Sequence, residues 1–186
     1  MPLSLDTLRF IREHLDDNPD QLLWKKNEYP DDRVIRAVEQ IQARENIKDK
    51  LPSWYACRDL FYPSKLSTEQ CSSEATASYK AQLATGNSLC DLTGGLGVDT
   101  YFFSRNANKV TYVEQNETYC EAARANFLAL GATNIEVCHA DATVMASRVI
   151  ADTYYIDPAR RTSDNKRVFA LTDPSLIHIS EPTRLR

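Results

Sequence analysis

The 186 residues include 22 lysines and arginines against 26 aspartates and glutamates, which gives a formal net charge of −4. This mild acidity excludes a general attraction to nucleic acid, so any contact with RNA requires a local basic patch. No apolar run approaches the roughly 18 residues of a membrane span, and the first residues are not a signal peptide. The length allows one domain with a substantial core.

The cysteines and histidines indicate neither disulfides nor a metal site. Five cysteines are present, an odd number, and none of them forms a C-x-x-C pair. We therefore expect reduced, mostly buried thiols in a cytoplasmic protein. Three scattered histidines, His14, His139 and His178, add no set of metal ligands, and no metal is expected.

Residues 1–60 are predicted to form a helical N-terminal extension. Apolar residues three and four positions apart recur in a first helix and in one at about 31–48, and a short helix is expected between them at about 21–26. The extension either helps to hold a substrate or packs against the rest of the chain, and we favour packing. The aromatic residues at 54–62 could stack on bases, but aromatic side chains in such a segment more often belong to a core.

One continuous helix is predicted over 67–84. Ser67 and Gln70 form a capping-box pattern at its start, and Gly86 stands where a C-terminal cap is expected. Its apolar face is predicted from residues spaced four apart: Ala75, Tyr79 and Leu83.

The stretch that follows combines a short strand, a glycine-rich turn and a helix. Ser88 to Leu92 is too short for a helix, and the glycines Gly94, Gly95 and Gly97 let backbone approach a ligand closely. A helix is expected over 98–105. This βα unit is either a tight turn without a ligand or the first unit of a Rossmann-like nucleotide site.

An acidic residue favours the nucleotide site. Glu114 ends a β-branched run that starts at Lys109, and it lies 23 residues after Asp91. A carboxylate roughly 20 residues after the glycine turn is placed to accept the ribose hydroxyls of a bound nucleoside. Such charge-assisted hydrogen bonds contribute about 1.5–3 kcal/mol each.

The acids near the turn favour S-adenosylmethionine over a dinucleotide. Thr100 stands where the third glycine of G-x-G-x-x-G is expected, and Asp91 and Asp99 would repel a pyrophosphate. The same two acids suit the sulfonium and ammonium groups of S-adenosylmethionine. No arginine follows Glu114 to bind the 2′-phosphate of NADP, since Gln115 comes next.

The remaining elements alternate between helix and strand. A helix is expected over 116–130, a strand over 135–137, a helix over 142–150 and a strand over 153–156. This order predicts an α/β fold with a parallel sheet.

Residues 91–99 (DLTGGLGVD) together with 112–116 (YVEQN) resemble the class I S-adenosylmethionine-dependent methyltransferases. More narrowly, with 69–77 and 155–161 included, the chain resembles a bacterial family with a THUMP-like C-terminal domain. The resemblance covers residues 61–171 and implies a Rossmann-like domain of which the first four strands are present. It implies that S-adenosylmethionine is held by these residues: Asp91, Thr93, Gly94, Gly95, Gly97, Asp99, Glu114 and Gln115.

The resemblance adds three further cofactor contacts, each with a structural alternative. Gln70 and Ser73 are implied at the methionine end of the cofactor, and the alternative is helix capping by the serines of this segment. Asp141 is implied as acceptor of the adenine amine, and the alternative is an N-cap for the next helix.

The catalytic residues implied by the resemblance are Asp157, Pro158 and Arg160. Amino-methyltransferases carry an acid or amide followed by Pro-Pro-aromatic here, and hold the nucleophilic nitrogen with it. Ala159 and Arg160 replace the second proline and the aromatic residue, which argues against transfer to adenine N6. Arg160 either binds phosphate or a base of RNA, or lies in a solvated turn.

The expected function is N-methylation of a nucleobase in tRNA or rRNA, with RNA implied by the resemblance alone. The alternative is a non-catalytic module that binds a nucleoside or RNA. Residues 172–186 resemble the translation of a sequencing adapter joined to a truncated gene, and the alternative is a natural tail with a fifth strand at 176–179.

Overall fold

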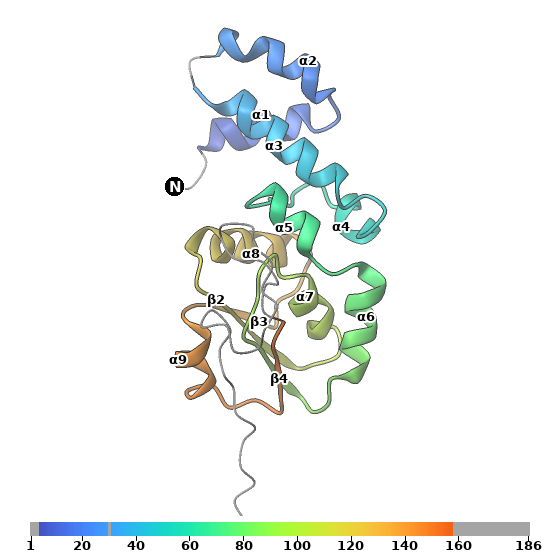
Figure 1. Ribbon diagram of the computed structural model, residues 1–186, viewed down its shortest axis with the longest axis vertical. Coiled ribbons are helices and arrows are strands. Elements are labelled where there is room, and N and C mark those ends of the chain that lie inside the picture. Colours follow the sequence, from blue (N-terminus) through green and yellow to red (C-terminus); the bar gives the residue numbers. More distant parts are fainter. Residues whose placement is uncertain (1–3, 30, 158–186) are drawn as a thin grey trace, which may run out of the picture. The chain divides into compact units, whose positions relative to one another are not determined.

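The computed structural model describes residues 4–29 and 31–157, and within them a parallel four-stranded sheet flanked by helices (Figure 1). One compact unit runs to Tyr155, and the described residues Ile156 and Asp157 fall in a second unit. The strands are β1 (Ser88–Asp91), β2 (Lys109–Glu114), β3 (Ile135–His139) and β4 (Thr153–Tyr155). The helices that follow the strands are α7 (Val98–Ser104), α8 (Glu117–Ala129) and α9 (Ala142–Ala146).

The strand order is β3-β2-β1-β4, and each neighbouring pair is parallel. In this register Asp91 pairs with Tyr112 on one side and with Tyr155 on the other, and Glu114 pairs with His139. The carboxyl ends of all four strands therefore meet at one edge of the sheet, where ligands bind in open α/β sheets. The α/β, Rossmann-like fold expected from the sequence is confirmed.

Alternate residues of the central strands enter two different cores. Leu89, Val110 and Tyr112 join the larger hydrophobic cluster, to which α6, α7 and α8 also contribute. Cys90 and Val113 point to the opposite face and join a smaller cluster that includes residues of α9. This alternation is the period-two pattern of a sheet covered on both faces.

The N-terminal helices are α1 (Leu5–His14), α2 (Pro19–Trp24), a 3₁₀ turn η1 (Lys25–Glu28), α3 (Arg33–Glu45) and α4 (Pro52–Ala56). The first three helices build a separate hydrophobic cluster around Phe10, Leu22 and Val34. Farther along, Ile47 and Trp54 belong instead to the main core beside the sheet. Residues before position 60 thus contribute to this N-terminal cluster and to the main core.

Two of the aromatic residues near the end of the extension, Trp54 and Tyr62, are core residues, as we favoured. Trp54 and Tyr62 are almost entirely buried. The Gln40 side chain donates to the Tyr62 carbonyl at 2.8 Å and accepts from its N–H at 2.9 Å. Asn126 of α8 makes the same reciprocal pair with the backbone of Phe61, both at 2.8 Å. These paired amide bonds fasten the segment to helices on either side.

The single helix expected over 67–84 is wrong: two helices form, α5 (Lys65–Gln70) and α6 (Glu74–Leu83). Ser64 caps α5, so Ser67 lies inside it instead of starting a capping box. Ser73 caps α6. Lys50 stabilises the break, because its Nζ donates to the carbonyls of Thr68 and Glu69 at 2.9 Å, as cations do at helix C-termini.

The apolar face predicted for this segment is also wrong. Ala77 and Ala81 are the buried residues of α6, whereas Tyr79 and Leu83 are each 62% exposed. The close contact of α6 with the rest of the fold admits only small side chains. Gly86 does not cap the helix either: Ala84 is the capping residue, and Gly86 lies at φ +86° with its missing Cβ pointing into the Asp152 side chain.

Several other boundaries differ modestly from expectation. The last strands are β3 to His139 and β4 only to Tyr155, and α9 ends at Ala146 instead of reaching Ile150. The longer β3 follows from its pairing with β2 as far as Glu114. Within the described ranges, no helix is long and apolar enough to cross a membrane, and all five cysteines are free thiols.

Candidate functional site at the carboxyl ends of the strands

The three glycines between β1 and α7 meet three different demands. A Cβ on Gly94 would lie 2.3 Å from the Tyr112 ring, so no side chain fits there. Gly97 has φ +88°, and a Cβ on it would lie 2.8 Å from Phe127. Gly95 has φ +52°, yet its missing Cβ meets nothing closer than 3.8 Å. The loop therefore packs tightly at Gly94 and Gly97 and leaves its backbone approachable at Gly95.

Glu114, at the end of β2, reaches this loop. Its Oε2 accepts the Gly95 N–H at 3.1 Å, and its Oε1 accepts the Asn116 N–H at 2.8 Å. A carboxylate offers about four acceptor positions, so two remain after these bonds. The carboxylate is thus held in place by backbone amides and keeps two acceptor positions, which match the two hydroxyls of a ribose.

Asp91, the last residue of β1, is 1% exposed and is bonded within the loop. Its carboxylate accepts the Thr93 N–H at 3.0 Å and the Thr100 hydroxyl at 2.6 Å. Burial raises the pKa of Asp91 to about 7, although both threonine bonds act to lower it. Asp91 therefore connects the start of the glycine-rich turn, at Thr93, to the first turn of α7, at Thr100.

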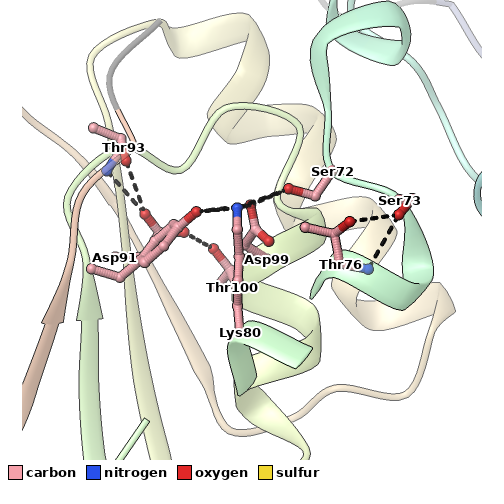
Figure 2. A network of polar contacts seen from close by, with 9 residues as sticks. Ser72, Ser73, Thr76, Lys80, Asp91, Thr93, Asp99 and Thr100 are labelled. Carbon is pink, nitrogen blue, oxygen red and sulfur yellow. Dashed lines mark hydrogen bonds and ion pairs between the residues drawn. The ribbon is translucent and has the colours of Figure 1, made fainter. Parts of the chain in front are cut away.

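Asp99, in the first turn of α7, lies in a polar cluster that Figure 2 shows from close by. Its Oδ2 accepts from Ser72 Oγ at 2.9 Å, from Lys80 Nζ at 3.2 Å and from the Tyr155 hydroxyl at 3.3 Å. Its Oδ1 is buried and accepts no hydrogen bond from the part of the chain that the structure describes. Oδ2 therefore accepts three hydrogen bonds, whereas Oδ1 can still accept one.

This cluster also contains Lys80 and Tyr155, for which the sequence predicts no cofactor contact. Lys80 Nζ donates to Tyr155 Oη at 2.5 Å and to Ser72 Oγ at 3.0 Å. Lys80 lies on α6 and Tyr155 ends β4, so 75 residues separate the two in the sequence. Only the packing of α6 against α7 and the β1–β4 pairing bring them together.

The other predicted cofactor residues lie in the loops around this edge. Thr93 lies in the glycine-rich turn, Gln70 is the exposed last residue of α5, and Ser73 caps α6 by accepting the Thr76 N–H at 3.1 Å. Gln115 is exposed, and its carbonyl lies 3.0 Å from His139 Nε2. Asp141 caps α9, where hydrogen bonds from Thr143 lower the pKa of its carboxyl.

The predicted catalytic residues lie at the border of the described chain. Asp157 follows β4 by two residues and is exposed. Pro158 and Arg160 lie outside the described residues, as does the segment 172–186. Across residues 4–29 and 31–157, no group of histidine, cysteine and acidic side chains could hold a metal ion.

Comparison with known proteins identifies a solved structure with a similar fold. No protein-family model matches the chain, and no curated protein matches it. Among solved structures, the chain is similar to a "putative methyltransferase" from Porphyromonas gingivalis W83, with a TM-score of 0.73 and 32% sequence identity. The match covers 84% of this chain but 41% of that protein, so this chain spans less than half of its length.

Proposed function

We propose that this chain carries the cofactor-binding part of an S-adenosylmethionine-dependent methyltransferase. The name of the Porphyromonas neighbour supports the activity. The observation that carries the proposal is the hydrogen bond that Glu114 accepts from the Gly95 N–H. Of the three loop glycines, Gly95 is the one that a ligand can approach, because its missing Cβ has no close neighbour. A ribose lying on Gly95 would place its hydroxyls within reach of the two free acceptor positions of this carboxylate.

The charges around the loop fit S-adenosylmethionine better than a dinucleotide. Asp99 lies in the first turn of α7, where a pyrophosphate would need to bind in a dinucleotide site. Its Oδ1 has capacity for a hydrogen-bond donor, which the cofactor's ammonium supplies and a phosphate does not. In this proposal Asp91 supports the conformation of the loop and does not touch the cofactor, because its side chain is buried under the loop.

The bound cofactor would supply an activated methyl group, and the protein would orient the acceptor. Glu114 would fix the ribose, the loop around Gly95 would support the nucleoside, and Asp99 would face the amino-acid end. We propose that Asp157 holds the acceptor nitrogen, because it follows β4 closely in the sequence. A nucleobase in RNA as acceptor, and the THUMP-like family, are proposed from the sequence resemblance.

Calorimetric titration of the whole chain with S-adenosylhomocysteine and with NAD tests the cofactor assignment. The proposal predicts binding of S-adenosylhomocysteine and weaker or absent binding of NAD. Glu114→Ala should lower the affinity for S-adenosylhomocysteine at least about a hundredfold, because two charge-assisted hydrogen bonds of about 1.5–3 kcal/mol each are lost.

The matched control is Glu136→Ala on the neighbouring strand, whose exposed carboxylate pairs with Lys109 away from the loop. This variant should bind as the unchanged protein does. Tighter binding of NAD than of S-adenosylhomocysteine, or equal affinities in both variants, would contradict the assignment.

A further inference from the structure

Tyr112 binds the same loop residue as Glu114, but through the carbonyl of that residue instead of its N–H. The Tyr112 side chain is almost fully buried, and its hydroxyl donates to the Gly95 carbonyl at 2.6 Å. Two residues along β2, Glu114 accepts the Gly95 N–H at 3.1 Å. Side chains two residues apart on a strand point to the same face, so β2 binds both the N–H and the carbonyl of Gly95 from one face of the sheet.

The packing around Tyr112 leaves its ring little freedom. One side of the ring lies against Gly94, where even a methyl group would come within 2.3 Å. The ring also meets Phe127 edge to face, with centroids 5.7 Å apart. Phe127 is in turn fixed beneath Gly97, where a Cβ would lie 2.8 Å away. The packing of the ring against Gly94 and Phe127 therefore sets the position of the hydroxyl.

A fixed donor matters most at Gly95, the most open of the three loop glycines. Its φ of +52° is a conformation that only glycine adopts at low cost, and no side chain of its own limits its motion. Burial raises the pKa of Tyr112, so the phenol stays protonated and remains a donor. Without this bond, the carbonyl of Gly95 would lose the contact that anchors it to the sheet.

We propose that Tyr112 is a positioning residue for nucleoside binding, whose hydroxyl fixes Gly95 and, through the Gly95 amide, the carboxylate of Glu114. This inference rests on the proposed function for the identity of the ligand and on the structure alone for the locking of the loop. It assigns to Tyr112 a role that its place in the hydrophobic core does not require, since phenylalanine would fill the same space.

The test compares Tyr112→Phe with Tyr101→Phe in the whole chain. Tyr101 is also buried, and its hydroxyl accepts from Arg105 at 2.9 Å, away from Gly95. Hydrogen exchange of the segment 92–98, without any ligand, should accelerate about fivefold in Tyr112→Phe, the equivalent of one hydrogen bond. Exchange in α8 should not change, and Tyr101→Phe should leave the loop as it is.

Titration with S-adenosylhomocysteine provides the second readout. Tyr112→Phe should weaken binding about fivefold, for the same reason. In the Glu114→Ala background the same substitution should change affinity much less, because the carboxylate that it positions is gone. A purely structural role would give the same loss in both backgrounds.

The outcomes separate this inference from the proposed function. Unchanged exchange in 92–98 overturns the role of Tyr112, whatever the ligand. Faster exchange with no binding of S-adenosylhomocysteine by the unchanged protein contradicts the proposed function and retains the loop lock. If Tyr112→Phe does not fold, the Tyr112 hydroxyl proton of the unchanged protein decides: it should give a slowly exchanging NMR resonance, and a rapidly exchanging one overturns the inference.

Discussion

Replacing Asp91 with asparagine should change how stability depends on pH. Burial raises the pKa of this carboxyl to about 7 in the folded protein, whereas it is near 3.9 in an unfolded chain. The folded state therefore binds the proton more tightly. Stability from this group is fully present below pH 4 and is lost as pH rises towards 7. Asparagine keeps an acceptor for the Thr93 N–H and cannot ionise.

The shift sets the size of the effect. A difference of about three pKa units corresponds to roughly 4 kcal/mol in all, of which about 3 kcal/mol falls between pH 5 and pH 8. Urea unfolding of both proteins at pH 5, 6, 7 and 8 measures it. The difference in unfolding free energy, unchanged protein minus Asp91→Asn, should fall by 2–3 kcal/mol over this range, flattening above pH 7. A constant difference would refute the account of the buried carboxylate.

Three further substitutions test separate parts of the site. Gly94→Ala should destabilise the fold by about 1–3 kcal/mol through its clash with Tyr112, measured by urea unfolding. Lys80→Met should cost about 1–3 kcal/mol, since Asp99 loses its charged partner, and should be seen as a lower thermal midpoint. Asp157→Ala should abolish transfer of a labelled methyl group while the affinity for S-adenosylhomocysteine stays the same.

For each of these variants, one result would contradict the prediction. A Gly94→Ala protein as stable as the original would show that the loop can move away from Tyr112. Lys109→Met is the control for Lys80→Met, because Lys109 pairs with Glu136 at an exposed site, and should leave the midpoint almost unchanged. Equal losses in the two lysine variants, or transfer by Asp157→Ala, would refute the corresponding roles.

The parts of the site that depend on residues close together in the sequence could be predicted. The glycine-rich turn and the strand that ends at Glu114 lie where the pattern places them, because a short β-branched run and positive-φ glycines have few alternative structures. The parallel sheet followed from the alternation of helices and strands. Short-range signals were sufficient for these elements.

The contacts made by distant residues could not be predicted. Lys80 reaches Tyr155 only after α6 packs against α7, and no spacing in the sequence indicates that meeting. The break between α5 and α6 depends on Lys50, which lies well before both helices. The buried face of α6 was misassigned because alanines carry little hydrophobic signal, although close packing requires them.

A crystal structure of the whole chain with S-adenosylhomocysteine would test the proposed cofactor site most directly. We expect both ribose hydroxyls within hydrogen-bond distance of the Glu114 carboxylate, the nucleoside over Gly95, and the ligand ammonium near Asp99. Well-ordered ligand elsewhere on the protein, or ribose hydroxyls bound by another acid, would contradict it.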